Sequence, residues 1–260
     1  MINLFQRTGK QASSNEKTTN ASLKNTFLNK SYQIHNVARL SHLESLGLPI
    51  IGRSVIEFGA GVGDHTFYYL TKGCRLVTTD ARNELVEFIK ERFDVTALTI
   101  NVETDIEKIK KLEKCDIVHC YGLLYHIRNP KEFLNALNSV CNLLLLETCV
   151  SHDLREDGEH LVSEDINNPT QAFSGGGCRP TRKWIYNVLR ENFRYVYVPK
   201  TQPNHPEFPL NWENEMEDRS RLIRAVFVAS QTDLGNNTHL TSSIPLLYEV
   251  PDFSALTDSF

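Results

Sequence analysis

Short apolar runs alternate with amphipathic stretches through the middle of the chain. The runs have the length of strands, and the stretches between them carry apolar residues at helical spacing. Strands that alternate with helices predict right-handed βαβ units and a mostly parallel sheet. The predicted strands are 55–58, 75–79, 97–100, 117–120, 143–147, 195–199 and 222–229. The predicted helices are 64–72, 83–93, a charged helix that ends at Lys114, 130–141 and 180–192.

Four further stretches complete the predicted domain organisation. Residues 1–31 form a polar N-terminal arm, which we expect to be flexible or to act as a lid that orders on binding. Residues 32–48 have apolar residues at Ile34, Val37, Leu40, Leu43 and Leu46, which predicts an amphipathic helix at the start of a domain spanning 32–230. Residues 151–182 break the alternation and are expected to be a substrate cover. Residues 231–260 are a C-terminal extension.

Composition narrows the class of protein. Hydrophobic residues make up 40% of the chain and charged residues 23%, which is typical of a globular domain. No apolar run approaches the roughly 18 residues that a membrane helix requires. Residues 1–10 lack the apolar core of a secretory signal, so we expect a cytoplasmic protein with reduced cysteines. The net charge of −4 argues against sequence-independent binding to nucleic acid.

A glycine-rich turn follows the first predicted strand. Gly59, Gly61 and Gly63 alternate with other residues between that strand and the next helix. Glycines there allow a sharp turn and a close approach of a ligand to the backbone. Asp80 ends the second strand, where a carboxylate can accept hydrogen bonds from both ribose hydroxyls of a nucleoside. The glycine turn and Asp80 together predict an adenosine ligand more specifically than either feature alone. The alternatives are a simple tight turn and a helix N-cap at Asp80.

The same turn discriminates between classes of nucleotide. A dinucleotide fingerprint that starts at Gly59 would need glycine at position 64, where this chain has Asp64. A carboxylate at the start of a helix would repel a pyrophosphate placed there. A ligand without phosphates that carries a positive sulfonium suits this acidic environment better. The sequence also lacks a phosphate-binding P-loop.

The turn and its acidic partner resemble those of the class I S-adenosylmethionine methyltransferases. The resemblance covers about residues 50–230 and implies a Rossmann-like α/β fold: a seven-stranded, mostly parallel sheet with helices on both faces and the last strand antiparallel. S-adenosyl-L-methionine is then the expected cofactor. The resemblance also implies which residues bind the cofactor. Glu57 would be the motif acid of the cofactor site, and Gly59, Ala60 and Gly61 would contact the methionine part. Asp80 and Ala81 would bind the ribose, Asn101 and Val102 would bind the adenine, and Cys120 and Tyr121 would flank the cofactor near its methyl group. Asn101 has the alternative of a simple turn residue.

The segment after the fourth strand is the candidate acceptor side. It places Tyr121, Tyr125 and His126 beyond the carboxyl end of a strand, where ligands bind in open α/β sheets. Methyl transfer to a hydroxyl or amine needs a group that removes a proton, and histidine titrates near neutral pH. We therefore predict His126 as the catalytic base and Tyr125 as a substrate-binding residue. The alternative for His126 is a structural hydrogen bond that holds the loop.

The segment Gly122–Pro130, with Glu147 on the next strand and the Arg179–Trp184 helix, looks similar to the bacterial tRNA wobble-uridine carboxymethyl-transferring enzymes and their methyltransferase relatives. Those enzymes carry a larger basic N-terminal region, which this chain does not match.

Arg179 and Arg182 follow Gly175–Gly177 and are expected to bind a carboxylate or phosphate of the substrate, or to be solvated arginines of a loop.

Histidines in the second half of the chain do not have the spacing of a metal site. His152, His160 and His205 lie among carboxylates, but their separation is irregular, so we expect no metal.

The sequence hypothesis is an enzyme that transfers a methyl group from S-adenosylmethionine to an oxygen or nitrogen of a small polar metabolite or sugar. The alternatives are an RNA-modifying methyl- or carboxymethyltransferase, possible despite the negative charge, and a non-enzymatic cofactor-binding subunit.

Overall fold

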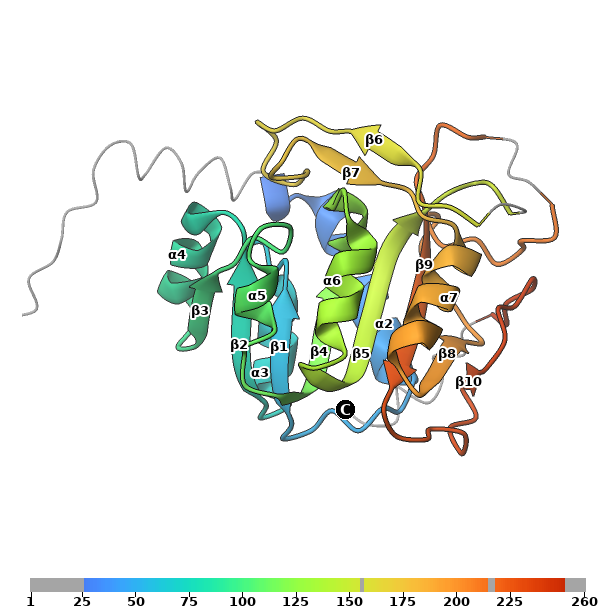
Figure 1. Ribbon diagram of the computed structural model, residues 1–260, viewed down its shortest axis with the longest axis horizontal. Helices are drawn as coiled ribbons and strands as arrows, with labels where there is room; N and C mark the ends of the chain where they lie inside the picture. The colour runs from blue at the N-terminus through green and yellow to red at the C-terminus, as the bar shows by residue number, and fades with distance from the viewer. Residues whose placement is uncertain (1–25, 155–156, 215–217, 251–260) are drawn as a thin grey trace, which may run out of the picture.

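One mixed sheet forms the centre of the molecule in the computed structural model, which describes residues 26–154, 157–214 and 218–250 (Figure 1). Among these residues the sheet has eight strands in the order β10-β8-β9-β5-β4-β1-β2-β3. The five strands β1 to β5 pair in parallel, whereas β9 runs antiparallel to both β5 and β8. The strands are β1 Ser54–Phe58, β2 Arg75–Asp80, β3 Thr96–Thr99, β4 Cys115–Tyr121, β5 Cys141–Val150, β8 Tyr195–Pro199, β9 Ile223–Ser230 and β10 Leu240–Thr241.

The predicted α/β architecture is confirmed, with one strand more than expected. The seven predicted strands are all present, and the last of them, β9, is the antiparallel one. The additional strand is β10, which pairs with β8 at the edge of the sheet. It lies in the expected extension 231–260, whose turn-rich sequence gives no strand signal over two residues. None of the helices in the described part of the chain is long and apolar enough to cross a membrane.

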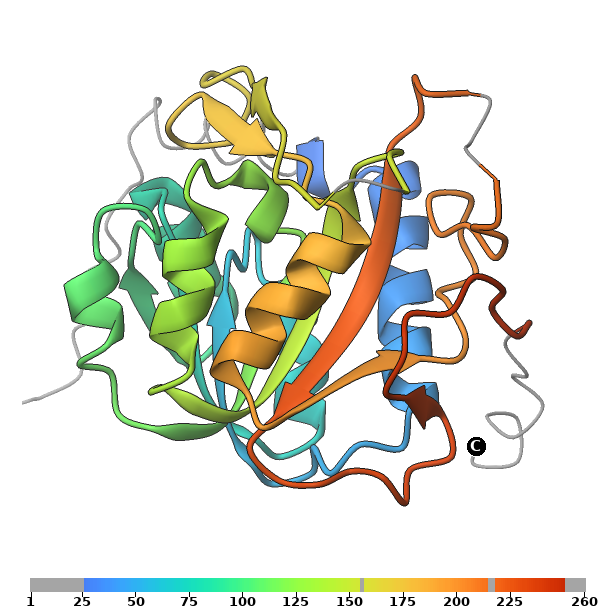
Figure 2. The same ribbon diagram turned by 45° about the vertical axis from the view of Figure 1, so that its right-hand side comes forward.

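Helices cover both faces of the sheet, as expected. Side chains of α5, α6 and α7 pack into one large apolar cluster, and side chains of α2 and α3 pack into a second cluster on the opposite face. Figure 2 shows α7 in front of the sheet and α2 behind it. The helices are α2 Lys30–Ser45, α3 Asp64–Thr71, α4 Asn83–Arg92, α5 Ile106–Ile109, α6 Pro130–Leu137 and α7 Arg182–Asn192.

The charged helix expected to end at Lys114 is much shorter than predicted. It is reduced to α5, a single turn that begins at Ile106 and ends at Ile109. These two isoleucines are buried. The four charged residues in 110–114 are exposed, and Leu112 between them is only partly buried. Without a continuing apolar face, tertiary packing does not extend the helix beyond one turn.

The helix α2 differs from the prediction in the face that it buries. Ile34 and Val37 of the expected apolar stripe are exposed, whereas Leu43 and Leu46 are buried. Four of the six buried residues of the helix are polar, and they are His35, Asn36, Arg39 and His42. Burial of polar side chains is tolerated because they find partners or face a ligand site. The polar side of α2 therefore points toward the functional region.

The segment expected as a substrate cover forms a small hairpin. Strands β6 Leu161–Ser163 and β7 Gly176–Cys178 pair antiparallel. Figure 1 shows this hairpin above the ends of β4 and β5. Of the predicted N-terminal arm, residues 1–25 lie outside the described residues. Phe27 is described and is buried against the glycine turn.

Candidate functional site

A cavity of about 340 Å³ lies at the carboxyl ends of the parallel strands. This volume is within the range of small-molecule binding pockets. Its walls come from the loops after β1, β2, β3 and β4, from the buried face of α2, and from the hairpin segment. The parallel strand order reverses between β1 and β4, and ligands of open α/β sheets bind at such a point.

The glycine turn forms the floor of the cavity. Gly59, Gly61 and Gly63 all have positive φ, at 71°, 58° and 84°. A Cβ atom at Gly59 would lie 3.0 Å from Leu123 Cβ, and one at Gly61 would lie 3.2 Å from the ring of Phe27. Glycine is therefore required both for the backbone conformation and for the space around it. Gly59, Ala60 and Gly61 all line the cavity, as the sequence predicts.

Asp80 lies at the end of β2 and faces the cavity beside the glycine turn. Its carboxylate accepts hydrogen bonds from the Gly61 N–H at 3.0 Å and the Arg82 N–H at 2.9 Å. Desolvation raises the pKa of Asp80 to about 6, although these two donors act in the opposite direction. Asp80 is not the N-cap of α4, because Arg82 has that position. The carboxylate thus joins the floor of the cavity to the loop after β2.

The adjacent loop residues lie where the sequence places an adenine site. Ala81, Asn101 and Val102 line the cavity next to Asp80. The Asn101 side-chain oxygen accepts the Glu103 N–H at 3.0 Å, so this residue also holds a turn, as the alternative interpretation states. Val102 is buried and offers an apolar surface. The two residues together provide a polar group and an apolar face at one end of the cavity.

Glu57 is buried beneath the glycine turn. Its carboxylate accepts the Thr66 hydroxyl at 2.6 Å. Burial raises the pKa of Glu57 to about 7, although the hydrogen bonds from Thr66 and Thr78 lower it. The residue lines the cavity, so its carboxyl group is available to a ligand there.

Cys120 and Tyr121 face opposite sides of β4, because successive side chains of a strand alternate. Tyr121 lines the cavity. Cys120 is fully buried in the cluster beneath α5, α6 and α7 and is not among the residues that line the cavity. The alternation of the strand therefore turns the Cys120 thiol into the core, away from the cavity beside which the residue was expected to flank a cofactor.

Two buried histidines lie next to Tyr121 and were not predicted. His65 Nδ1 and His119 Nε2 are 2.9 Å apart, and His119 Nδ1 is 2.8 Å from the Tyr69 hydroxyl. Burial lowers the pKa of His119 to about 3 and also lowers the pKa of His65. Both rings are therefore neutral, and one N–H···N hydrogen bond joins them. This chain of hydrogen bonds fixes the His65 ring in the cavity wall.

His126 is held by a carboxylate from the hairpin segment. Its Nδ1 atom makes a very short hydrogen bond with Glu164, which also accepts the Ala172 N–H. Burial raises the pKa of Glu164, but the hydrogen bond with His126 and the charge of Arg179 outweigh this effect and keep it below its ordinary value. Glu164 is thus ionised and can only accept, so His126 Nδ1 donates. The other ring nitrogen, Nε2, is then an acceptor.

The His126 imidazole is neutral. Burial lowers its pKa, and the charges of Arg179 and Arg224 lower it further, although Glu164 acts in the opposite direction. A neutral ring with a fixed tautomer is the form that can take a proton. His126 lines the cavity, and its ring centroid is 3.9 Å from that of Tyr125. The geometry therefore allows both the proton acceptor and the structural role that the sequence left open.

A buried charge network, which the sequence did not predict, closes the side of the cavity next to β9. Glu147 accepts hydrogen bonds at 3.0 Å from both Arg39 and Arg224. Arg224 also donates to Glu207 at 2.6 Å and to the Tyr125 hydroxyl at 3.2 Å. Buried charges are stable only when they are paired in this way. The network fixes the Tyr125 ring between α2, β5 and β9.

The two arginines predicted to bind substrate have different surroundings. Arg179 lines the cavity and pairs with Glu164 at 3.3 Å. Arg182 is buried elsewhere: it stacks over Trp212 at 3.9 Å and donates to the Pro245 carbonyl at 2.9 Å. Arg182 is not among the residues that line the cavity. Instead it fastens the C-terminal extension to α7, away from the cavity where substrate binding was expected.

Several lining side chains have a buried polar atom that no described residue satisfies. Three of these atoms are Arg39 Nε, His65 Nε2 and the Tyr121 hydroxyl. Buried polar groups are almost always hydrogen-bonded, and three such atoms around one cavity fit a ligand rich in polar groups. A nucleoside bearing an amino acid is a ligand of this kind. The residues present therefore fit the cofactor implied by the sequence resemblance.

Comparisons with known proteins agree with this geometry. A family model described as "Methyltransferase domain" matches residues 26–194. The chain is 29% identical over 158 residues to a tRNA U34 carboxymethyltransferase of Vibrio atlanticus, in a match that covers 57% of this chain and 48% of that protein. A tRNA U34 carboxymethyltransferase of Vibrio vulnificus is 28% identical over 155 residues, with the same coverage. The chain thus spans about half the length of these curated relatives.

Solved structures show the same fold at low sequence identity. The N-terminal domain of EvdMO1, crystallised in the presence of SAH and D-fucose, aligns with a TM-score of 0.55 and 20% identity, covering 74% of this chain and 82% of that domain. The magnesium protoporphyrin IX methyltransferase of Synechocystis PCC 6803 with bound SAH has a TM-score of 0.54 and 13% identity, covering 84% of this chain and 96% of that enzyme.

Proposed function

The chain belongs to the methyltransferase domain family, and we propose that it transfers a methyl group from S-adenosylmethionine to an oxygen or nitrogen of a small polar molecule. The observation that carries the proposal is one continuous cavity. It joins a nucleoside floor, formed by the glycine turn and Asp80, to an acceptor side that holds His126 and Tyr125. When bound, the cofactor supplies an electrophilic methyl group on a positively charged sulfur.

The residues on the cofactor side bind and orient. Asp80 accepts the ribose hydroxyls, and Asn101 with Val102 holds the adenine. The positive φ of Gly59 and Gly61 keeps the backbone close to the methionine part. Glu57 and the unpartnered atoms of Arg39, His65 and Tyr121 add polar groups around it. Methyl transfer is an in-line displacement, so this alignment supplies much of the rate.

The residues on the acceptor side handle the proton. His126 Nε2 accepts the proton that an acceptor hydroxyl or amine loses, while Glu164 holds Nδ1–H and stabilises the imidazolium. Arg179 lies beside this pair and suits an acidic or polyhydroxylated acceptor. The segment 164–179 forms part of the same wall. The cavity has the size of a small-molecule pocket, which supports a small acceptor over a macromolecule.

A second candidate is an RNA-modifying methyl- or carboxymethyltransferase. It is favoured by the similarity to the tRNA U34 carboxymethyltransferases over 57% of this chain. The net charge of −4 disfavours it, because RNA binding depends on neutralising phosphates with basic residues. Incorporation of labelled methyl into bulk tRNA, compared with a metabolite extract, separates the two candidates.

The test of the proposed function has two steps. Calorimetric titration of the purified full chain with S-adenosylhomocysteine should show one site with saturable binding. Incubation with S-adenosylmethionine carrying a labelled methyl group and a metabolite extract should then label a small molecule. His126→Gln should lower this turnover by about 10²- to 10⁴-fold without changing the affinity for S-adenosylhomocysteine. Equal turnover in His126→Gln would assign His126 to the structural role, and lack of binding would refute the function.

A further inference from the structure

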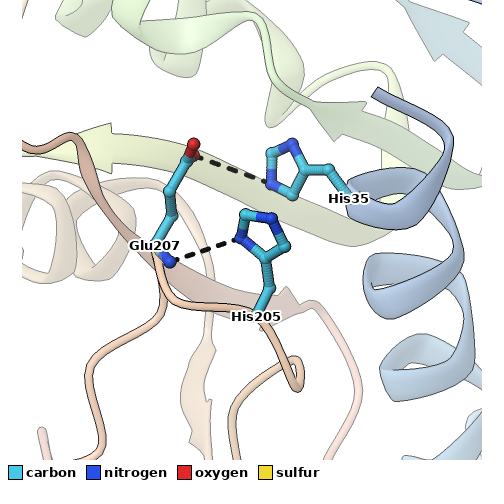
Figure 3. A group of neighbouring side chains, drawn as sticks. All are labelled: His35, His205 and Glu207. Carbon is cyan, nitrogen blue, oxygen red and sulfur yellow. Dashed lines mark hydrogen bonds and ion pairs between the residues drawn. The ribbon is translucent and has the colours of Figure 1, made fainter. Parts of the chain in front are cut away.

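Three metal-ligating side chains gather at the wall of the cavity next to β9. Figure 3 shows His35, which α2 carries, beside His205 and Glu207 from the loop between β8 and β9. One ligand atom of each residue lies within 4.8 Å of the others. The two imidazole rings stack with centroids 4.6 Å apart, and His35 Nε2 is 3.9 Å from Glu207 Oε2. Irregular spacing along the sequence hides this cluster.

The state of His35 is that of a ligand. Only 7% of its surface is exposed, and its Nε2 atom is buried without a hydrogen-bond partner among the described residues. A buried imidazole nitrogen with a free lone pair is able to bind a metal ion.

The other two residues are held in place by hydrogen bonds of their own. His205 Nδ1 accepts the Glu207 N–H in a long hydrogen bond of 3.3 Å, which a metal ion on this nitrogen would have to replace. Arg224 Nε donates to Glu207 Oε2 at 2.6 Å and orients the carboxylate. Metal-ligating carboxylates are commonly held by such outer hydrogen bonds. The structure thus provides the three ligands and an outer hydrogen bond that supports Glu207.

Nearby positive charges are balanced. The guanidinium groups of Arg39 and Arg224 are paired with the carboxylate of Glu147, and Arg224 is also paired with Glu207. Glu207 is itself the carboxylate of the cluster, so the two guanidinium groups, Glu147 and Glu207 are neutral in sum before any metal ion is added. The cluster contributes two imidazoles and this carboxylate, which is the ligand set of many catalytic zinc sites.

We propose that His35, His205 and Glu207 form a binding site for one divalent transition-metal ion, with Zn²⁺ the ion that this ligand set fits. His35 and Glu207 also line the cavity, so a metal ion held by them would lie at its wall. A ligand oxygen bound there would lose its proton more readily, as water does on zinc. This use on the acceptor side rests on the proposed function, whereas the metal site itself does not.

The experiment is a titration of the metal-free full chain, prepared by dialysis against a chelator, with Co²⁺ and then with Zn²⁺ in competition. We expect one equivalent of Co²⁺ to bind and to give the visible absorption of a low-coordinate nitrogen and oxygen site, which Zn²⁺ then displaces. His205→Gln removes one of three protein ligands at a partly exposed position and should weaken Co²⁺ binding by at least about tenfold.

The matched control is His239→Gln, which changes an exposed histidine outside the cluster and should leave Co²⁺ binding unchanged. Glu207→Gln serves as a second ligand variant and should weaken binding in the same way as His205→Gln. Absence of Co²⁺ binding, or equal binding by His205→Gln and the wild type, would overturn the metal site. Titration with S-adenosylhomocysteine in the presence of chelator keeps the two proposals apart: nucleoside binding without metal binding refutes this inference alone.

Discussion

Removing the carboxylate of Asp80 tests the nucleoside site most directly. The change Asp80→Ala deletes both acceptors that the proposed ribose contact needs. Hydrogen bonds to a charged group contribute about 1.5–3 kcal/mol each, so the loss of two weakens S-adenosylhomocysteine binding by roughly 3 kcal/mol or more. At about 1.4 kcal/mol for each factor of ten, this is a loss of about 100-fold or more in Kd.

The fold should tolerate the same change. The two N–H groups that Asp80 accepts, from Gly61 and Arg82, lie beside the open cavity and can be solvated. Desolvation raises the pKa of Asp80 to about 6, which means that the ionised carboxylate is held at a cost to the folded state. Loss of the hydrogen bonds and relief of this cost oppose each other. We expect the thermal midpoint of Asp80→Ala to lie within a few degrees of the wild type.

The assay is calorimetric titration at several pH values, with thermal unfolding measured in parallel. In the wild type the affinity should fall as the pH drops through about 6, because protonation of Asp80 removes the charge. In Asp80→Ala the affinity should be weak at every pH in this range. The control is Asp94→Ala, which changes an exposed aspartate away from the cavity. An unchanged Kd in a folded Asp80→Ala protein would refute the assignment of Asp80 to the ribose.

Three further outcomes follow from the structure. Gly61→Ala forces a side chain onto a φ of 58° and against a ring 3.2 Å away, so urea unfolding should show a loss of roughly 1–2 kcal/mol together with weaker S-adenosylhomocysteine binding. Glu147→Gln leaves two buried guanidinium groups without their shared counter-charge and should lower the free energy of unfolding by about 3–5 kcal/mol, measured in urea; a change below about 1 kcal/mol would contradict the network. His65 and His119 are neutral in the folded protein but protonate below about pH 6.5 in the unfolded chain. The free energy of unfolding should therefore fall as the pH drops from about 6.5 toward 3. A thermal midpoint independent of pH would contradict the burial of these two histidines.

The cofactor half of the site could be predicted because its signal is local. A glycine turn between a strand and a helix, and an acid at the end of the next strand, are contiguous in the sequence and have a fixed place in a βαβ fold. Twelve of the fourteen predicted site residues line the cavity; the two exceptions are Cys120 and Arg182. In both cases the difference concerns the direction of a side chain. Strand alternation could have corrected Cys120, whereas the burial of Arg182 depends on the distant Trp212.

The acceptor half could be predicted only in part, because its residues come from distant segments. His126 and Arg179 were found, but Glu164, which links them, lies in an irregular segment without a motif. The polar face of α2 was hidden by an apolar stripe that is partly exposed. The sequence does contain a signal for this polar face: His35, Arg39 and His42 recur at helical spacing and so share one side of the helix.

The contact between His126 and Glu164 has a consequence for redesign of acceptor choice. The segment that walls the acceptor side also supplies the carboxylate that fixes the imidazole tautomer. If His126 is the proton acceptor that we propose, transplanting a foreign hairpin in order to change the substrate would remove the group that fixes its tautomer unless position 164 keeps its acid. Under the proposed function, a library that varies the hairpin should therefore hold that one position constant.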